Sequence, residues 1–356
     1  MKKHVSLFVM AAMLMLACMP VAAKKNKNAD EQAPKGNYSL ACIGFYNLEN
    51  LFDTINDPNK NDEEFLPDGS YHWTGMKYNA KLKNMAYAIS QMGIDKTPIG
   101  PMVLGVSEVE NIGCLQDLVA QPAIADRNYV PILLEGPDRR GVDVGLLYNP
   151  DYFQPTNTKG YTLYIDGEIV YTRYELLVSG YLLGEKVHFI VNHWPSRYGG
   201  EEYSRPRRKA AAALCRQICD SIYQRESDAR IIIMGDLNDD PFNASTAEVL
   251  DAKKNKNDVK PQGYYNTMWK MLDRGIGTLL YNNNWDLFDQ IIISEPMAHG
   301  DYTKWTFWKP EVFNPEFLIQ QDGRYKGAPK RTHSGGVWLN GYSDHFPTMI
   351  YLLRKK

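Results

Sequence analysis

The sequence predicts a layered α/β fold, with many strands and a few covering helices. Short apolar runs recur along the chain and end abruptly in polar residues, which is typical of buried strands. Longer stretches between some of these runs place apolar residues at helical spacing. No strong linker and no internal repeat divides residues 38–356, so one large domain is expected there.

The predicted strands are rich in Val, Ile, Leu and Tyr, and they cover residues 40–46, 102–107, 142–148, 187–191, 231–234, 290–293 and 348–353. Helices are predicted over residues 76–92 and 208–223, where apolar and small side chains recur at helical spacing. The polar stretch at residues 251–266 is predicted to be a surface loop rather than a domain boundary.

The first residues predict export. Lys2 and Lys3 precede an apolar run at residues 5–16 that is too short to span a bilayer, and small residues follow up to Ala23. This pattern is typical of a signal peptide over residues 1–23, cleaved after Ala23. The protein is therefore expected to be periplasmic, extracellular or anchored by lipid at the cell surface.

Cys18 leaves a second outcome open for this segment. The sequence Leu16-Ala17-Cys18 partly resembles a bacterial lipoprotein processing site, and a lipidated Cys18 would anchor the chain to a membrane. Residues 24–37 are rich in Lys, Asn and Asp and have no apolar periodicity. They are therefore predicted to be a flexible tether.

The net charge and the cysteine spacing limit which partners and which metal sites are expected. The formal net charge is -2, and loss of Lys2 and Lys3 with the signal peptide brings it to about -4, so no global attraction to nucleic acid is expected. A local basic cluster is either a positive groove or the solvated start of a helix, and it comprises Arg197, Arg205, Arg207, Arg208 and Lys209. The cysteines after the signal peptide have no zinc-site spacing and are predicted to be packed thiols: Cys42, Cys114, Cys215 and Cys219.

Several predicted strands run into polar side chains that could carry chemistry. Glu108 directly follows an apolar run, and burying a carboxylate costs several kcal/mol or more unless a charge compensates it. Mg²⁺ would provide that compensation, because it binds carboxylates and waters. Asn47 ends another strand, and His193 a third, although a turn or a packed histidine would explain either residue alone.

A second set of residues could handle water and protons. Asp236 and Asn238 lie two positions apart after a glycine and could together hold a water molecule, with an Asx turn as the alternative. Asp344 and His345 precede the last strand, where adjacent side chains point to opposite faces. Asp289, distant in sequence, is therefore the better partner for His345, which leaves Asp344 free to face a metal.

In this order, the motifs resemble the complete set of the endonuclease/exonuclease/phosphatase superfamily, which includes pancreatic-type deoxyribonucleases, apurinic endonucleases, neutral sphingomyelinases and inositol-polyphosphate phosphatases. The motifs are Tyr-Asn-Leu-Glu-Asn at Asn47, Ser-Glu-Val-Glu-Asn at Glu108, Asn-His-Trp-Pro-Ser-Arg at His193, Gly-Asp-Leu-Asn-Asp at Asp236, Phe-Asp-Gln-Ile at Asp289 and Ser-Asp-His-Phe-Pro at His345. No motif residue is lost, which argues against a non-catalytic surface binding protein.

The resemblance implies a four-layer α/β sandwich, in which two mostly antiparallel sheets pack face to face with helices outside. It implies that Glu108 is the principal ligand of Mg²⁺, or alternatively of Mn²⁺ or Ca²⁺, with Asn47 and Asp344 near the ion or the phosphate. The other roles it implies are water positioning by Asp236 and Asn238, an Asp289–His345 pair, and contact of His193 with the scissile phosphate. The general base is left open between Asp236 and His345.

The expected substrate is a phosphoester, with nucleic acid favoured. Residues 139–148 look like a stretch of secreted nucleases in the superfamily, and Arg140 and Arg197 are candidate substrate contacts. Phe346 and the Leu-Phe-Asp-Gln sequence around Asp289 count against a phosphoinositide substrate. The aromatic residues at 303–308 could contact a membrane, stack on bases or pack in the core. A nuclease-like phosphodiesterase is therefore predicted, with a phosphatase or a sphingomyelinase-type phospholipase C as alternatives and no protein partner implied.

Overall fold

The computed structural model describes residues 34–281, 283–323 and 325–356. The predicted signal peptide, Cys18 and most of the predicted tether lie outside these residues. Residues 34–356 form one compact unit. Among the described residues, every helix is too short or too polar to span a bilayer.

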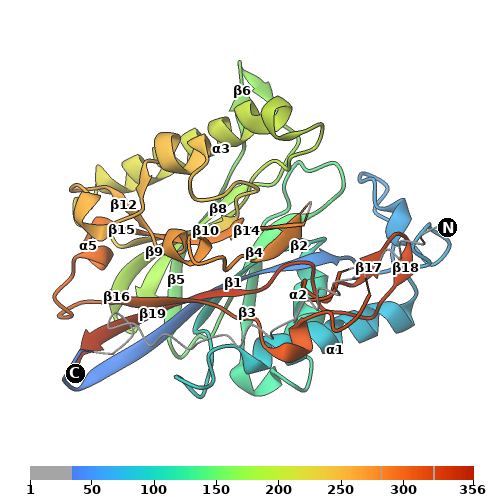
Figure 1. Cartoon of the computed structure of the whole chain (residues 1–356), viewed down its shortest axis with the longest axis horizontal. Coiled ribbons are helices and arrows are strands. Elements are labelled where there is room, and N and C mark those ends of the chain that lie inside the picture. Colours follow the sequence, from blue (N-terminus) through green and yellow to red (C-terminus); the bar gives the residue numbers. More distant parts are fainter. Residues whose placement is uncertain (1–33, 282, 324) are drawn as a thin grey trace, which may run out of the picture. The chain divides into compact units, whose positions relative to one another are not determined.

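Two large β-sheets form the centre of this unit (Figure 1). In spatial order, the first contains β16 (Thr306–Val312), β19 (Thr348–Lys355), β1 (Tyr38–Leu51), β2 (Val103–Val109), β4 (Asp143–Tyr148) and β3 (Val130–Leu133). The second contains β11 (Ala252–Lys253), β12 (Tyr264–Asn266), β15 (Asp289–Ser294), β10 (Ile231–Asp236), β9 (Glu185–His193), β8 (Glu175–Leu182) and β5 (Phe153–Tyr161). Most neighbouring pairs are antiparallel, and the parallel ones are β1–β2, β9–β10 and β11–β12.

Helices cover the outer faces of the sheets. The α-helices are α1 (Gly75–Gln91), α2 (Ile112–Val119), α3 (Glu201–Tyr223), α4 (Trp269–Leu272) and α5 (Glu295–Ala298). Helices α1 and α2 pack on the first sheet and α3 packs on the second. Short helical turns occur at η2 (Glu63–Phe65), η3 (Ala125–Arg127), η4 (Ser245–Val249), η5 (Lys256–Asp258) and η6 (Glu316–Leu318). The predicted four-layer sandwich is thus confirmed.

In the described part of the chain, three small two-stranded ribbons lie outside the two large sheets. They pair β6 (Tyr164–Ile165) with β7 (Glu168–Ile169), β13 (Leu279–Tyr281) with β14 (Asn284–Asp286), and β17 (His333–Ser334) with β18 (Val337–Trp338). Each ribbon lies in a connection between longer elements.

The position of β1 between two cores explains why its sequence is apolar on both faces. Ile43 and Phe45 point into the core between the two sheets, whereas Cys42 and Tyr46 point into the core under α1 and α2. A strand covered on both faces reads as a continuous apolar run rather than an alternating one. The run predicted at residues 40–46 extends in the structure to residues 38–51.

Two predictions about side-chain packing are resolved by this core. The four described cysteines are buried as free thiols, as expected. Trp305 and Phe307 are buried between the sheets, so the aromatic residues at 303–308 provide core packing rather than a surface for membranes or bases.

The prediction of a surface loop over residues 251–266 is wrong in part. Residues 264–266 form β12, which pairs with β15 and extends the second sheet. Tyr264 and Tyr265 are buried, and the lysines and asparagines that precede them obscure so short a strand in the sequence.

Candidate active site

The strand register brings the predicted site residues to one edge of the sandwich. In the second sheet, Asp236 pairs with His193 on one side and with Asp289 on the other. In the first sheet, the regular pairing of β1 with β2 ends at the pair of Asn47 and Ser107, and Glu108 directly follows Ser107. Residues separated by up to about 240 positions therefore meet where the ends of both sheets converge.

Local irregularities aim two of these side chains. The register of β2 shifts at Glu108, whose φ of 59° lies in the left-handed region, and Asn238 has a φ of 51°. Such conformations are costly for residues with a side chain and occur preferentially at functional sites. Gly235 allows β10 to approach β9, because a Cβ there would lie 2.1 Å from the Asn192 carbonyl oxygen.

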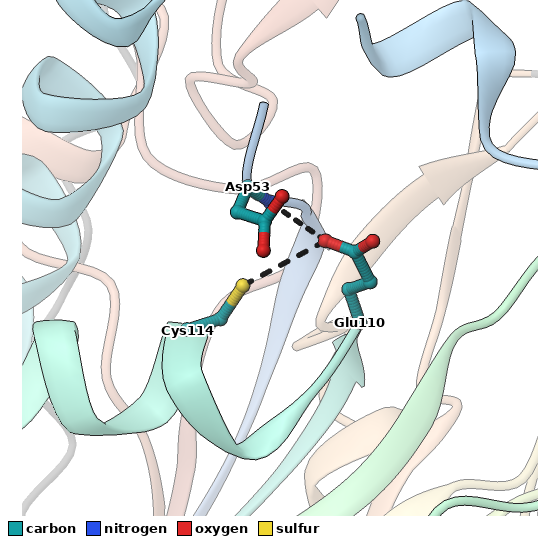
Figure 2. A group of neighbouring side chains, drawn as sticks. All are labelled: Asp53, Glu110 and Cys114. Carbon is teal, nitrogen blue, oxygen red and sulfur yellow. Dashed lines mark hydrogen bonds between the residues drawn. The ribbon is translucent and has the colours of Figure 1, made fainter. Parts of the chain in front are cut away.

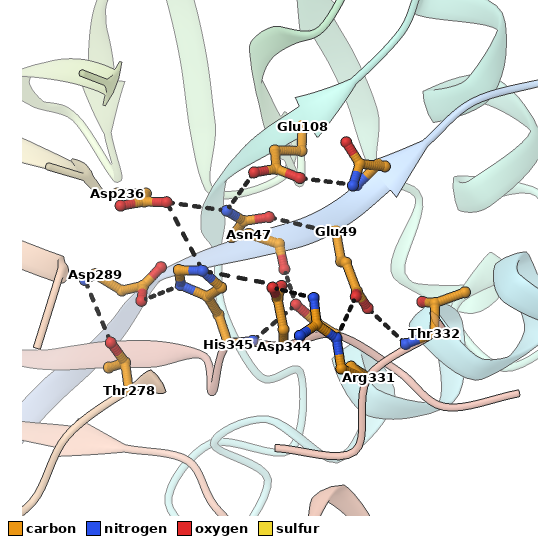
Figure 3. Close-up of polar contacts among 12 residues, drawn as sticks. Asn47, Glu49, Glu108, Asp236, Thr278, Asp289, Arg331, Thr332, Asp344 and His345 are labelled. Atoms are coloured by element: carbon orange, nitrogen blue, oxygen red, sulfur yellow. Dashed lines mark hydrogen bonds and ion pairs between the residues drawn. The ribbon is translucent and has the colours of Figure 1, made fainter. Parts of the chain in front are cut away.

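One amide joins the carboxylates of the two sheets. Asn47 Nδ2 donates hydrogen bonds to Glu108 Oε1 at 3.2 Å and to Asp236 Oδ2 at 3.1 Å (Figure 3). Asn47 Oδ1 accepts the Glu49 backbone N–H at 2.8 Å, which fixes the orientation of the amide. The backbone N–H of Asn50 donates to Glu108 Oε2 at 3.0 Å. Asn47 therefore presents a donor, rather than an oxygen, to the space between the carboxylates.

His345 lies among three carboxylates. Its Nδ1 is 2.6 Å from Asp289 Oδ2, and its Nε2 is 3.9 Å from both Asp236 Oδ2 and Asp344 Oδ1. Figure 3 shows the ring between Asp289 and Asp344. Burial lowers the pKa of His345, but the three carboxylates outweigh burial and raise this pKa well above its ordinary value. The ring is therefore an imidazolium at neutral pH.

His193 has the opposite electrostatic environment. Its Nε2 lies 3.6 Å from Asp236 Oδ2 and 3.9 Å from Glu108 Oε1. Burial lowers its pKa well below the ordinary value, and the guanidinium groups of Arg173 and Arg140 lower it further. His193 is therefore a neutral imidazole.

Asp236 accepts a hydrogen bond from the backbone of Asn238 and lies near both histidines. Its Oδ1 accepts the backbone N–H of Asn238 at 3.0 Å, and Asn238 Nδ2 donates to the Trp194 carbonyl at 3.0 Å. The Asx turn that was the alternative explanation for this pair therefore forms, and the Asn238 amide donates to Trp194. Burial raises the pKa of Asp236 to about 7, while the charge of His345 opposes this rise and the charge of Asp289 adds to it.

A partly buried ion network supports the site and was not predicted. Arg331 donates from Nε to Glu49 Oε1 at 3.2 Å and from Nη2 to Asp344 Oδ2 at 3.0 Å. The backbone N–H of Thr332 donates to Glu49 Oε2 at 2.6 Å, and Lys81 Nζ lies 4.0 Å from the same oxygen. Asp344 is therefore tied to an arginine rather than free.

One sequence feature could have revealed this network. Lys81 occupies the buried face of α1 together with Tyr78, Leu82 and Met85. A lysine at a core position of an amphipathic helix requires an acidic or polar partner, because a buried charge is costly without one. Nothing in the sequence pattern singled out Arg331, which lies in an irregular segment.

The two candidate substrate arginines lie in different environments. Arg140 is half exposed, with its Nε 3.8 Å from Asp138 Oδ1, and its charge acts on His193. Arg197 is mostly buried; its Nη2 lies 3.2 Å from Asp239 Oδ1, and its Nε donates to the Asn238 carbonyl at 3.0 Å. Arg140 is thus open to a ligand, whereas the donors of Arg197 hold the loop that carries Asn238.

A second group of carboxylates follows the same two strands (Figure 2). Glu110 Oε2 accepts the Asp53 backbone N–H at 2.7 Å and lies 3.9 Å from Cys114 Sγ. Asn111 Nδ2 donates to Asp53 Oδ2 at 3.0 Å, while its Oδ1 caps α2 by accepting the Cys114 N–H at 3.0 Å. Burial raises the pKa of Glu110 to about 7. These bonds join the segment after β1 to the start of α2, so the group stabilises the fold.

Comparisons with known proteins agree with this fold. The model of the Endonuclease/Exonuclease/phosphatase family matches residues 42–354, so the chain belongs to that family. Its members are metal-dependent phosphoester hydrolases, including nucleases and phosphatases. No curated protein matches the chain in sequence.

Solved structures share the fold at low sequence identity. An endonuclease/exonuclease/phosphatase family protein from Bacteroides thetaiotaomicron is 14% identical, with a TM-score of 0.54 and coverage of 89% of this chain and 98% of its own. A mannosyl-6-phosphatase from the same organism is 15% identical, with a TM-score of 0.53 and coverage of 88% and 99%. TDP2 from D. rerio, complexed with a single-strand DNA product, is 14% identical, with a TM-score of 0.50 and coverage of 88% and 99%.

Proposed function

We propose that this protein is an exported, Mg²⁺-dependent, nuclease-like phosphodiesterase. The observation that carries the proposal is the meeting of Glu108, Asn47 and Asp236 with the Asp289–His345 pair at one edge of the sandwich. Phosphodiester hydrolysis needs a positioned water, a proton acceptor and compensation of the charge that grows on the phosphoryl oxygens. This group of side chains can provide all three.

The donor set fits a hard divalent cation. Glu108 and Asp236 both lie within 3.2 Å of Asn47 Nδ2, and two carboxylates held so close repel each other unless a cation or a proton intervenes. Their oxygens suit Mg²⁺, with Mn²⁺ or Ca²⁺ as alternatives, and Glu108 is the proposed principal ligand, with Asn47 and Asp344 nearby. When bound, the ion would supply positive charge to the phosphoryl oxygens.

Proton transfer is assigned from the hydrogen-bond geometry. His345 Nδ1 is engaged by Asp289, and the surrounding carboxylates keep the ring protonated, so its Nε2 has a proton to donate but no lone pair to accept one. Asp236 Oδ2 has room to accept a proton from water, which Asn238 would orient. We therefore assign Asp236 as the general base, and His345 and His193 as partners of the phosphoryl oxygens.

Nucleic acid is the proposed substrate. Arg140 presents a half-exposed guanidinium beside His193, where it can hold a phosphate adjacent to the one that is cleaved. The solved complex of D. rerio TDP2 with a single-strand DNA product offers a precedent on the same fold. Export, as predicted from residues 1–23, suits a role in degrading phosphoesters outside the cell.

A small phosphomonoester is a second candidate, favoured by one cavity. This space of about 140 Å³ is lined by Glu49, Asn50, Tyr71, Arg331 and His333, among others, and so lies next to the proposed metal ligands. His333 Nε2 is buried and has no hydrogen-bond partner among the described residues. A polar cavity of this size suits one hydroxylated ring rather than a polynucleotide.

A substrate panel separates the two candidates. Plasmid DNA, RNA, bis-p-nitrophenyl phosphate, sphingomyelin and hexose phosphates would each be incubated with Mg²⁺ or with excess EDTA. We expect Mg²⁺-dependent cleavage of the polynucleotides and of bis-p-nitrophenyl phosphate, and no cleavage in EDTA. Cleavage of phosphomonoesters alone would replace the first proposal by the second, and activity in excess EDTA would refute the metal dependence.

A further inference from the structure

One cleft outside the candidate active site combines an exposed aromatic ring with two arginines that form no ion pair among the described residues. It has a volume of about 490 Å³ and lies between the β6–β7 ribbon, the segment that follows it and α3. We call it the arm cleft. Its walls include Arg139, Tyr171 and Arg207, and its floor includes Ile165, Ile169 and Val170. Figure 1 shows the ribbon next to α3, as their contacts require.

One tyrosine ring, Tyr171, lines the arm cleft, and two more exposed tyrosines lie on α3 and in the loop before it. Tyr171 is 52% exposed, and Tyr203, on the same face of α3 as Arg207, is 67% exposed. Tyr198, in the loop between β9 and α3, is 83% exposed. Exposed tyrosine rings can stack on a flat ligand, and exposed apolar surface of this kind is typical of binding sites.

The arginines carry charge that the protein does not neutralise. Arg139 lies over the Tyr171 ring, with 4.4 Å between the guanidinium carbon and the ring centroid, and Arg207 lies 6.0 Å from the Tyr203 centroid. Neither forms an ion pair with a carboxylate among the described residues, although Glu168 also lines the cleft. The side chains thus offer positive charge beside flat rings, which complements phosphates alternating with bases.

The arm cleft is connected to the catalytic residues through one short segment. Arg139 adjoins Arg140, whose charge reaches His193. Asp138, in the same segment, accepts from Arg173 at 3.1 Å, and Arg173 donates to the His193 carbonyl at 3.0 Å. A strand whose scissile phosphate lies at His193 can therefore continue past Arg140 into the cleft.

We propose that the arm cleft binds the unpaired bases of a single-stranded nucleic acid next to the scissile phosphate. This inference rests on the proposed nuclease function and adds a preference for single strands to it. Stacking on Tyr171 and Tyr203 requires the faces of the bases, which a duplex keeps covered. Arg139 and Arg207 contact the backbone phosphates that flank those bases.

Binding tests the proposal directly. Fluorescence anisotropy in EDTA would measure the Kd of a short labelled single-stranded oligonucleotide and of its duplex. Wild-type protein should prefer the single strand, and Tyr171→Ala should raise the single-strand Kd about tenfold. Arg139→Ala with Arg207→Ala should reduce the slope of log K against log salt by roughly 0.7 for each phosphate that the variant no longer neutralises.

Matched controls lie away from the arm cleft. Tyr181→Ala removes an exposed tyrosine from the opposite end of β8, and Arg225→Ala removes an arginine just beyond the C-terminal end of α3. Both should leave the Kd within about twofold of wild type. All variants should hydrolyse bis-p-nitrophenyl phosphate at the wild-type rate, because this small ester does not reach the cleft, and this activity also shows that they are folded.

The outcomes distinguish the two proposals. If wild-type protein does not bind the single strand, or if cleft variants bind it as tightly as wild type does, the arm cleft proposal is wrong. If wild-type protein binds the single strand but cuts no polynucleotide with Mg²⁺, the nuclease function is wrong and the cleft is a binding site alone.

Discussion

His345 Nδ1 and Asp289 Oδ2 lie 2.6 Å apart in a buried pair formed by residues 56 positions apart in the chain. Asp289 begins β15 in the second sheet, whereas His345 precedes β19 in the first. The contact therefore joins the two halves of the sandwich at the catalytic edge. It also fixes the tautomer and the charge of the ring, since a carboxylate at Nδ1 favours the imidazolium.

Asp289→Asn should disable His345 while leaving substrate binding nearly intact. The amide keeps the shape of the carboxylate but removes the charge that holds the proton on the ring. We expect kcat for bis-p-nitrophenyl phosphate to fall by about 10²–10⁴-fold with little change in KM. Asp228→Asn, at an exposed carboxylate, is the control. An unchanged kcat in Asp289→Asn would remove His345 from the chemistry.

Glu108→Gln and Asp236→Asn should fail in different ways, because one residue is proposed to hold the metal and the other to accept a proton. In Glu108→Gln, the Mg²⁺ concentration that gives half-maximal activity should rise at least about tenfold, and excess Mg²⁺ should restore part of the rate. In Asp236→Asn, kcat should stay low, by about 10²–10⁴-fold, at every Mg²⁺ concentration. Identical Mg²⁺ titrations for the two variants would contradict this division of roles.

The long helices and strands could be predicted from their apolar periodicity. The polar residues at the strand ends could be predicted as site candidates because each interrupts an apolar run. Glu108 follows an apolar run that is buried on both faces, so its carboxylate could be recognised in the sequence as one that needs a compensating charge. The Asp289–His345 pair was predicted from the period of two in a strand. The pair forms, although residues 344 and 345 lie in a bend ahead of β19 and His345 Nε2 is 3.9 Å from Asp344 Oδ1. These features are local in sequence even though their contacts are not.

Apart from Lys81, the supporting residues could not be predicted, because their partners are set by the packing of irregular segments. Arg331 reaches Glu49 and Asp344 from a loop with no periodicity. The sequence predicts Arg197 as a substrate contact, yet Asp239 and Asp240 engage it after the chain turns at Asn238. Strand β12 is only three residues long and follows a polar stretch, so the hydrogen bonds of the sheet edge, rather than residue pattern, define it.

Lys81→Met should destabilise the fold through Glu49. Lys81 is fully buried, donates to Thr332 Oγ1 and to the Tyr342 carbonyl, both at 2.5 Å, and lies 4.0 Å from Glu49. Removing one partner of a buried ion network typically costs about 3–5 kcal/mol of unfolding free energy. Urea denaturation would measure the loss. Lys83→Met, on the exposed face of the same helix, should change it by less than about 0.5 kcal/mol, and equal losses would refute the network's role.

Export predicts a defined N-terminus. When the full chain is expressed in a Gram-negative host, cleavage after Ala23 should give a soluble periplasmic or secreted protein that begins at Lys24, as N-terminal sequencing would show. Lipidation would instead give a membrane-bound protein with a blocked Cys18 that incorporates labelled palmitate, and Cys18→Ser would release it. Full-length protein in the cytoplasm would contradict both outcomes.

Glu175 should make stability depend on pH. It begins β8 inside the core, with the indole of Trp194 and the thiols of Cys215 and Cys219 beside its carboxyl group. Burial raises the pKa of Glu175 well above its ordinary value, so the carboxyl group is protonated when the protein is folded at neutral pH. Folding then takes up a proton that the unfolded chain has lost above about pH 4.5.

The sign of this effect follows from the raised pKa of Glu175. Below about pH 4.5 both states hold the proton and no cost arises, whereas above it the free energy of unfolding should fall by about 1.4 kcal/mol for each pH unit, until the folded pKa is reached. Glu175→Gln keeps the hydrogen-bonding shape without the titration, so its stability relative to wild type should increase as the pH rises from 5 to 7. Urea denaturation at the two pH values measures this difference, with Glu316→Gln, at an exposed position, as the control. A constant difference between wild type and Glu175→Gln would mean that Glu175 is ionised in the folded protein, which its apolar surroundings make too costly without a cation beside it.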